Sequence, residues 1–508
     1  MSKARLIADR DFAVGPIDRR IFGSFAEHLG RCIYGGLYEP GHPQADAQGF
    51  RRDVLALVRE LGVSVVRYPG GNFVSSYRWE DGVGPRGQRP VRRDPAWTSV
   101  ESNQFGTDEF IAWCRTAGVE PMLAVNLGSR GVEAAGDYAE YCNHPGGTRL
   151  SDLRRAIGHA DPHGVRLWCL GNEMDGPWQY GHKTATEYGR LARECAKAIG
   201  TTDRHYGAGE APPVEFIACG SSHRGMPTYG AWEREVLEEC YDHIHHLSLH
   251  QYYNDRAGDP ATFLARSQEM DAYISEVVAV CDAVKARRRS RRTITLSFDE
   301  WNVWYHSHGA ERLVPPWSAA PPILEDVYTA ADALVVGGLL ISLLSHADRV
   351  RIACLAQLVN VIGPIMTRTG GPAWRQTIFH PFALAARHAT GTALRTLVES
   401  PTYACGVGPA VPLLQALAIR RDDGGVTVLA LNRDLAEPLD LELDLRSFPA
   451  LRPTGWQVLH EADLQAVNDE RHPDRVAPRG GGAVDGDGRV FRARLPPASW
   501  SVLTFAAG

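Results

Sequence analysis

The chain has 508 residues, of which 44% are hydrophobic and 22% charged, a balance typical of a globular protein with two or three domains. Its 54 basic and 60 acidic residues leave a formal charge of −6, and neither half is strongly basic, so nucleic acid is not an expected partner. The longest apolar run, residues 333–344, falls short of the ~18 residues that a membrane span needs. We therefore expect no membrane partner and interpret this run as a buried helix.

The first residues and the cysteines bear on the compartment. The segment MSKARLIADRDFAVG has no apolar stretch after its basic residues, so we expect no secretory signal. The ten cysteines are scattered singly, mostly in apolar segments, and no C-x-x-C pair occurs. This spacing favours reduced thiols in a protein core over disulfides or a zinc site. The sequence therefore predicts a cytoplasmic protein.

Short β-branched runs alternate with helical patterns over residues 20–385, which is typical of βα units around a parallel sheet. The predicted strands begin at Ile21, Ser64, Pro121, Val165, Glu215, His243, Thr293 and Val350. Eight strands, each followed by room for a helix, predict a (β/α)8 TIM barrel with inserted loops, since the bare fold takes ~250 residues. An open doubly wound sheet is the competing architecture, but no G-x-G-x-x-G motif follows any of these runs.

Strands without intervening helices follow residue 385. Leu439, Leu441, Leu443 and Leu445 alternate strictly with acidic residues, which indicates a strand with one buried and one wet face. We expect an antiparallel β-sandwich over residues 386–508, and residues 1–19 add a strand to it in this prediction.

Two of the predicted barrel strands end in glutamates. The fourth strand ends in Gly171-Asn172-Glu173 and the seventh in Asp299-Glu300, and catalytic groups of this fold lie at the C-terminal strand ends. Glycoside hydrolysis requires two carboxyl groups across a pocket, one to protonate the leaving oxygen and one to attack the anomeric carbon. Either glutamate alone could merely cap the following helix. The pair in this strand order indicates a glycosidase.

Other strand ends carry groups that suit a bound sugar. Carboxylate, amide, guanidinium and phenol groups can together satisfy hydroxyls that both donate and accept, and tryptophan rings can stack on the sugar. The candidates are Glu27, His28, Arg67, Asn72, Asn126, His250, Tyr252 and Gln357, with Trp97, Trp301 and Trp304 as stacking rings. Any one of them could equally be a buried core residue, and only their shared position at one rim groups them.

Five segments resemble glycoside hydrolase family 51. They are EHLGRCIYGGLYEP from Glu27, RYPGGNFVSSYRWEDGVGP from Arg67, LGNEMDGPWQYGHK from Leu170, LSLHQYY from Leu247 and SFDEWNVWY from Ser297. The resemblance covers nearly the whole chain. It implies a retaining α-L-arabinofuranosidase with a barrel and a jelly-roll-like sandwich, commonly assembled as a homohexamer. The crowded polar rim indicates a pocket, so we expect exo action, and we expect no cofactor.

The resemblance also implies roles for individual residues. Glu173 is then the acid/base, Glu300 the nucleophile, and Asn172 the partner of the sugar 2-hydroxyl. Trp97 and Trp304 match aromatic positions near the bound sugar or the leaving group. The implied lining of the subsite for the terminal arabinofuranose is Glu27, Arg67, Asn72, Asn172, Tyr252 and Gln357.

A catalytic metal is the first competing hypothesis, because HIHHLSLH contains an H-x-H pair. Strand alternation places His243 and His245 on one face, and His246 and His250 on the other face with Tyr252. The H-x-H pair therefore points away from the proposed site, and we expect no metal. The basic run KARRRSRR, residues 285–292, directly follows a helical pattern, where cations complement a helix C-terminus, so it does not indicate nucleic-acid binding.

Two functional alternatives remain at this point. A non-catalytic carbohydrate-binding protein has no need of both glutamates. Another retaining glycosidase of the same clan, such as a β-xylosidase or an endoglucanase, would share the glutamates, and only the resemblance around Glu27 and Arg67 argues against it. Linkage preference, natural substrate and oligomeric state stay open.

Overall fold

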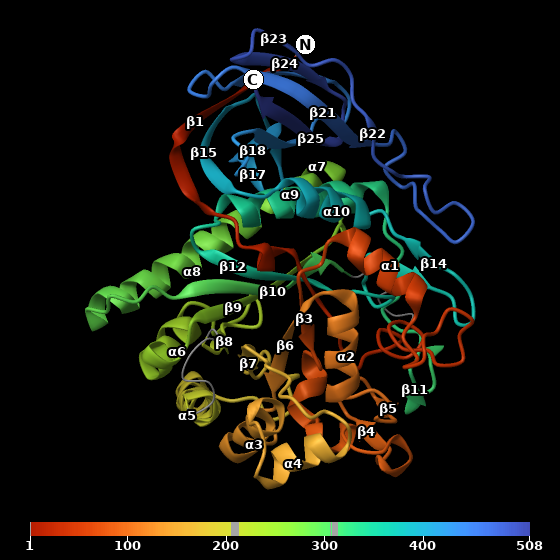
Figure 1. Ribbon diagram of the computed structural model, residues 1–508. Coiled ribbons are helices and arrows are strands. Elements are labelled where there is room, and N and C mark those ends of the chain that lie inside the picture. The colour runs from red at the N-terminus through yellow and green to blue at the C-terminus, as the bar shows by residue number, and fades with distance from the viewer. Residues whose placement is uncertain (1, 205–212, 305, 307–312) are drawn as a thin grey trace.

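The computed structural model describes residues 2–204, 213–304, 306 and 313–508, and it contains two units stacked on each other (Figure 1). The larger unit is a closed barrel of eight parallel strands. Around the barrel these are β2 (Gly23–Phe25), β3 (Val65–Tyr68), β6 (Glu120–Val125), β7 (Leu167–Leu170), β8 (Glu215–Cys219), β9 (His246–Tyr253), β10 (Thr295–Val303) and β12 (Val350–Ala356). Each strand overlaps one of the eight predicted runs, so the barrel prediction is confirmed.

Helices surround the barrel and separate it from the second unit (Figure 1). They are α1 (Arg52–Leu61), α2 (Thr107–Ala117), α3 (Val132–Asn143), α4 (Arg149–Ala156), α5 (Ala185–Arg204), α6 (Ala231–Cys240), α7 (Pro260–Leu264), α8 (Ser267–Arg288), α9 (Ala330–Ser345) and α10 (Phe379–His388). Short 3-10 turns are η1 (Arg19–Phe22), η2 (Asn72–Ser76), η3 (Trp79–Gly82), η4 (Arg86–Gln88) and η5 (Tyr241–His243). None of the described helices has the length and apolar character that a bilayer crossing requires.

The second unit is one ten-stranded sheet. Its order is β22 (Arg479–Gly480), β21 (Leu451–His460), β25 (Ser499–Ala507), β19 (Val426–Asn432), β18 (Leu414–Arg420), β15 (Thr392–Glu399), β1 (Ser2–Pro16), β20 (Leu439–Asp444), β24 (Val490–Leu495) and β23 (Asp485–Gly486). All neighbours are antiparallel except β1 and β20, which run parallel. Smaller pairings join β4 (Arg92–Asp94), β5 (Ser99–Glu101) and β11 (Ser318–Ala319), then β13 (Ile365–Thr367) with β14 (Ala373–Arg375), and β16 (Thr402–Cys405) with β17 (Gly408–Pro412).

The helix α9 joins the two units. It is buried from Ala330 to Leu344, as its apolar sequence predicts, and it contacts both the barrel and the sheet. A Cβ atom on Gly337 would lie 2.5 Å from the Trp500 ring of β25, so the glycine lets the sheet approach the helix. A separate apolar core fills the sheet unit, and strands from both of its halves contribute to it.

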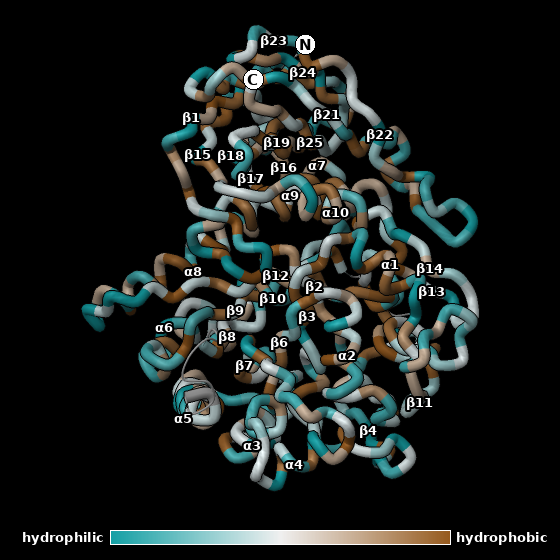
Figure 2. The backbone as a smooth tube through the Cα atoms, viewed as in Figure 1, coloured by the Kyte–Doolittle hydropathy of each residue, from teal (hydrophilic) through white to brown (hydrophobic). Residues whose placement is uncertain are grey.

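The basic run ends a projecting helix. Figure 2 shows this free end of α8 in teal, whereas brown segments run through the centres of both units. Arg287 pairs with Glu238 of α6 at 2.9 Å, and Arg288 pairs with Asp242 at 2.5 Å. The run thus belongs partly to the last turn of α8, and two of its cations pair with carboxylates of neighbouring segments.

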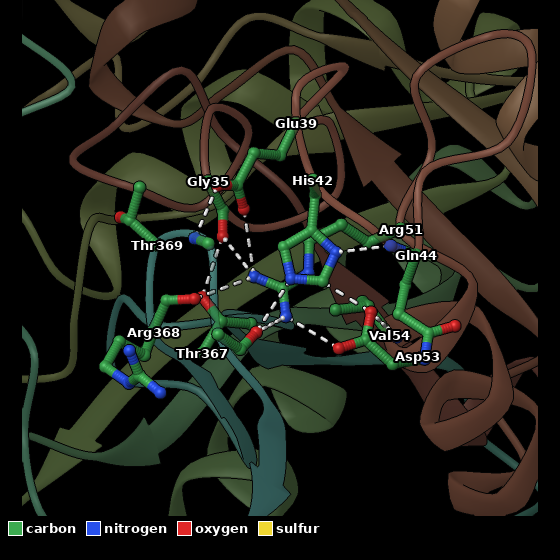
Figure 3. A network of polar contacts seen from close by, with 12 residues as sticks. Gly35, Glu39, His42, Gln44, Arg51, Asp53, Val54, Thr367, Arg368 and Thr369 are labelled. Atoms are coloured by element: carbon green, nitrogen blue, oxygen red, sulfur yellow. Dashed lines mark hydrogen bonds and ion pairs between the residues drawn. The ribbon is translucent and has the colours of Figure 1, made fainter.

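A buried arginine fixes the long segment between β2 and α1 (Figure 3). Arg51 is fully buried and pairs with Asp53 at 2.6 Å and with Glu39 at 3.0 Å. It also donates to the backbone oxygens of Arg368 and Gly371, which belong to the loop between β13 and β14. Because a guanidinium with several charge-assisted partners has one favoured geometry, this network holds two loops of the barrel rim together.

Candidate active site

Glu300 lies on β10 with a donor on each carboxylate oxygen. Arg67 of β3 donates to one oxygen at 2.6 Å, and the Tyr252 hydroxyl of β9 donates to the other at 2.9 Å. The register of the two strands places Glu300 beside His250. Three barrel strands therefore fix the orientation of this carboxylate.

Glu173 follows β7 and has a left-handed backbone, with φ of 44°. Such a conformation is uncommon for a residue with a side chain and is often found at functional sites. The Trp178 indole donates to one carboxylate oxygen at 2.7 Å, and His250 Nδ1 lies 3.0 Å from the other. One oxygen of Glu173, one oxygen of Glu300 and a ring nitrogen of His250 all lie within 4.8 Å of one another.

Glu27 forms the opposite wall. One of its oxygens accepts from the Phe73 backbone N–H and from the Trp97 indole, each at 3.0 Å. The other oxygen accepts from the Gln357 amide at 3.0 Å. Burial raises the pKa of Glu27 to about 8, against the lowering effect of the Phe73 hydrogen bond. This carboxyl group therefore holds its proton near neutral pH and can both donate to and accept from a sugar hydroxyl.

Two asparagines connect these walls. Asn172 accepts from Arg67 at 2.7 Å and donates to Asn72 at 3.3 Å. Gly71 lies between them, and a Cβ atom there would meet Glu300 at 3.0 Å and both Asn172 and Glu27 at 3.5 Å. The backbone thus comes so close to the carboxylates that a side chain at residue 71 would enter the site.

These groups open into a pocket of about 550 Å³ at the C-terminal ends of the barrel strands. Eight of the ten residues that the family resemblance assigns to the site line it. Of the other two, Arg67 donates to Glu300 and Asn172 accepts from Arg67. The lining residues proposed from the sequence are Glu27, Asn72, Trp97, Glu173, Tyr252, Glu300, Trp304 and Gln357. The pocket has the size of a small-ligand site.

Comparisons with known proteins agree with this geometry. Models of an α-L-arabinofuranosidase 1 domain and an α-L-arabinofuranosidase C-terminal domain match residues 57–273 and 299–499. The chain is 52% identical to an intracellular exo-α-(1→5)-L-arabinofuranosidase of Halalkalibacterium halodurans over 98% of each protein. It is 49% identical to an exo-α-(1→6)-L-arabinofuranosidase of Bifidobacterium longum, over 99% of this chain and 97% of that one.

The chain belongs to the family 51 α-L-arabinofuranosidases. A solved family 51 α-L-arabinofuranosidase from Bifidobacterium longum has a TM-score of 0.94 and 45% identity, with 99% of this chain and 100% of that one covered. The arabinose complex of an α-L-arabinofuranosidase from Thermotoga maritima has a TM-score of 0.87 and 34% identity, with 99% of each chain covered.

Three of the residues predicted at the rim of this family 51 enzyme lie elsewhere. His28 points away from the pocket, between Glu101 and the Tyr68 hydroxyl at 2.8 Å each. The side chain of Asn126 bonds to its own loop, since its oxygen accepts hydrogen bonds from the backbone N–H groups of Gly128 and Ser129. Trp301 is fully buried. These three predictions are wrong.

The structure adds residues that the sequence did not indicate. Trp178 stacks on His223 with ring centroids 6.1 Å apart, and both rings line the outer part of the pocket. Gln251 and Asn254 also line the pocket. The nearness of Trp178 to the G-N-E motif was an available signal, but its loop has no periodicity that would orient the ring.

The histidine-rich segment divides between the two ends of the barrel. His246 lies at the N-terminal end of β9, 2.8 Å from Glu215, and His245 accepts from the Phe216 backbone N–H. Of the histidines in this segment, His250 is the one that contacts Glu173 and Glu300. Another His and Asp grouping in the described residues is Asp108, His159 and His163, but Asp108 already accepts from Tyr141 and His163. The absence of a metal stays a prediction.

Proposed function

We propose that this protein is an exo-acting, retaining α-L-arabinofuranosidase that removes terminal non-reducing arabinofuranosyl residues from arabino-oligosaccharides. The observation that carries the proposal is the approach of Glu173 and Glu300 to within 4.8 Å in one pocket. Retaining glycosidases place their carboxyl groups ~5–5.5 Å apart, whereas inverting enzymes leave ~6.5–9.5 Å for a water molecule.

In the first step, Glu300 attacks the anomeric carbon while Glu173 donates a proton to the departing oxygen. Arg67 and Tyr252 orient the attacking carboxylate. The step forms a covalent arabinofuranosyl-enzyme and releases the leaving group. In the second step, Glu173 accepts a proton from water as the water attacks the anomeric carbon, and Glu300 departs as the free carboxylate. Two inversions give net retention.

The inner wall suits one sugar ring. Glu27, Gln357 and Asn72 present carboxyl and amide groups on one side, and we assign Asn172 to the sugar 2-hydroxyl beside Glu300. Trp97 and Trp304 supply apolar faces. The outer wall, with Trp178 and His223, is left to contact the leaving group. Relatives with 1→5 and with 1→6 in their names are about equally similar to this chain, so overall similarity does not decide which linkage is cleaved. We assign the preference for a linkage to this outer wall, because the leaving group binds there.

Wider features are proposed on the same basis. We place the enzyme in the cytoplasm, acting on short imported arabinosides, because its relatives include enzymes named intracellular. We also propose a homohexamer, which sedimentation analysis would test. Residues 20–385 are proposed as the catalytic unit, with residues 1–19 and 386–508 forming the sheet unit, and the pairing of β1 with β15 and β20 supports this division.

The test combines a substrate panel with product stereochemistry. Nitrophenyl α-L-arabinofuranoside should be cleaved far faster than the β-xylopyranoside and β-glucopyranoside, and proton NMR should show α-L-arabinofuranose as the first product. Release of internal fragments from linear arabinan before terminal arabinose would contradict the exo mode. A first product of β configuration would contradict retention, and absence of turnover on every glycoside would favour a binding protein.

A further inference from the structure

Asp299 is a buried carboxylate beneath the two catalytic glutamates. It neighbours Glu300 on β10, is 1% exposed and does not line the pocket. One of its oxygens lies 3.2 Å from His250 Nε2, and the other lies 3.6 Å from Arg67 Nε. Neither nitrogen makes a hydrogen bond of good geometry with any described residue, so its contact with the Asp299 carboxylate is an ion pair. The Nε side of the Arg67 guanidinium and the Nε2 side of the His250 ring therefore both face Asp299.

The opposite edges of the same two cations contact the catalytic pair. Arg67 Nη1 donates to Glu300 at 2.6 Å, and His250 Nδ1 lies 3.0 Å from Glu173 and 3.6 Å from Glu300. The Ser248 hydroxyl also donates to Asp299, and the Cys169 thiol lies 3.8 Å from it. One carboxylate thus contacts both groups that orient the catalytic glutamates.

The net charge of this cluster depends on which of its groups are ionised. Burial opposes ionisation of Asp299, but Arg67 and His250 outweigh it and lower the pKa of Asp299. Burial also disfavours the charged form of His250 and so lowers its pKa, but Glu300, Asp299 and Glu173 outweigh burial and raise the pKa of His250 to about 10. Burial raises the pKa of Tyr252 and of the facing thiols, so they are neutral; the thiols are Cys169, Cys219 and Cys354. Arg67 and His250 then face three carboxyl groups, those of Asp299, Glu173 and Glu300. The cluster has no net charge when one of the two glutamates holds a proton.

We propose that Asp299 is a positioning residue that holds Arg67 against Glu300 and His250 against Glu173, so that one buried charge orients both catalytic carboxylates. The inference rests on the proposed function of those two glutamates. Removing the charge leaves two buried cations without their shared partner, which is costly in a protein interior. Loss of a negative charge also makes every neighbouring group release its proton at lower pH.

The variant Asp299→Asn keeps the size of the side chain and removes its charge. We expect kcat on nitrophenyl arabinofuranoside to fall about 100-fold with KM changed less than about 3-fold, because the substrate-binding wall is untouched. The whole pH profile of kcat/KM should move to lower pH. Ser248→Ala, which keeps the charge, should lower kcat only a few-fold and leave the profile in place.

The matched control is Asp108→Asn. Asp108 is also a buried aspartate, 5% exposed, that accepts from His163 at 2.8 Å and from Tyr141 at 2.7 Å, but none of these residues lines the pocket. This variant should lose thermal stability and keep the wild-type kcat and pH profile. The inference is overturned if Asp299→Asn behaves in the same way, with loss of stability alone.

If Asp299→Asn does not fold, a measurement on the wild-type enzyme still tests the inference. In nitrogen NMR of labelled histidines, the His250 ring, assigned by its loss in His250→Gln, should carry protons on both nitrogens at pH 7. A ring protonated on one nitrogen overturns the inference. If wild type and Asp108→Asn cleave no arabinofuranoside, the proposed function fails, while the NMR result still tests whether His250 is the cation that Asp299 is proposed to hold.

Discussion

The two ends of the barrel carry the same kinds of charged residue and use them differently. At the N-terminal end, Arg20 pairs with Glu120 at 2.7 Å and with Glu215 at 2.9 Å, and Glu215 contacts His246 at 2.8 Å. Both carboxylates there contact Arg20, and none of these residues lines the catalytic pocket. At the other end, three carboxyl groups share two cations beside an open pocket. The comparison teaches that an open pocket beside carboxyl groups that share their cations, and not the residue types, marks the reactive end.

The largest effect is expected from removing the nucleophile. Glu300→Ala should lower kcat by about 10⁴- to 10⁶-fold even with a nitrophenyl leaving group, because no other carboxylate can attack the anomeric carbon. Any product formed with added azide should have the inverted β configuration. Glu215→Ala, at the opposite end, should keep kcat within a few-fold. Comparable losses in both variants would remove the distinction between the two ends.

Removing the acid/base should have a smaller and conditional effect. Glu173→Ala should lower hydrolysis of the aryl arabinofuranoside by about 10²- to 10⁴-fold, since the activated leaving group needs no proton but the attacking water needs a base. Azide needs no base, so it should accelerate turnover and yield the α azide. The retained azide from the Glu300 variant and the inverted one from the Glu173 variant would reverse the assigned roles.

Stability should depend on pH with opposite signs at the two ends. Hydrogen bonds from His246 and Arg20 lower the pKa of Glu215 to about 2, although burial opposes them, so the stability this group contributes is present above its ordinary pKa and is lost as pH falls towards 2. Burial raises the pKa of Glu27 to about 8, so this group makes the folded state less stable as pH rises from its ordinary pKa to 8.

Two glutamine variants measure this contrast. Relative to wild type, Glu27→Gln should gain a few kcal/mol of unfolding free energy, roughly, between pH 5 and 8. Glu215→Gln should be less stable than wild type at neutral pH and approach it below pH 3. Chemical denaturation across this pH range gives both curves, and parallel curves would contradict the assigned protonation states.

The smallest effect concerns the outer wall. Trp178→Phe keeps a ring against His223 but removes the indole donor to Glu173, so we expect about a 10-fold fall in kcat, the size of a lost hydrogen bond to a charged group. Trp317→Phe is a fair control, because the two rings are similarly exposed, at 48% and 43%. Unchanged kinetics in Trp178→Phe would show that this hydrogen bond does not orient the acid/base.

The barrel could be predicted from the sequence because its strands are short apolar runs at regular intervals. Glu173 and Glu300 could be singled out because catalytic groups of this fold lie at the C-terminal ends of strands. Its errors at the rim have separate causes. Trp301 is adjacent to Glu300 on β10, so strand alternation turns it away from the pocket, whereas His28 lies beyond the end of β2 and contacts Glu101 and Tyr68. Asn126 is held by local turn hydrogen bonds, and a side chain that can bond to its own loop is not free to reach a ligand.

The outer wall was missed for a different reason. Trp178 and His223 lie in loops after β7 and β8, and their stacking joins segments with no shared register. Likewise, Asp299 was recognised only as part of a motif, since contact with both Arg67 and His250 depends on three strands meeting. Periodicity orients residues within an element, whereas relations between elements require the closed barrel.

The central place of β1 in the ten-stranded sheet has a consequence for biosynthesis. This strand is made well before its neighbours, β15 and β20, which begin at Thr392 and Leu439. At ~5–20 residues per second, a ribosome needs ~20–75 seconds between completing β1 and starting β15. During that interval both edges of β1 lack their partners, and edges of this kind recruit foreign strands. Nascent chains of this enzyme should therefore depend on chaperones until the sheet closes, even though the barrel strands are complete earlier.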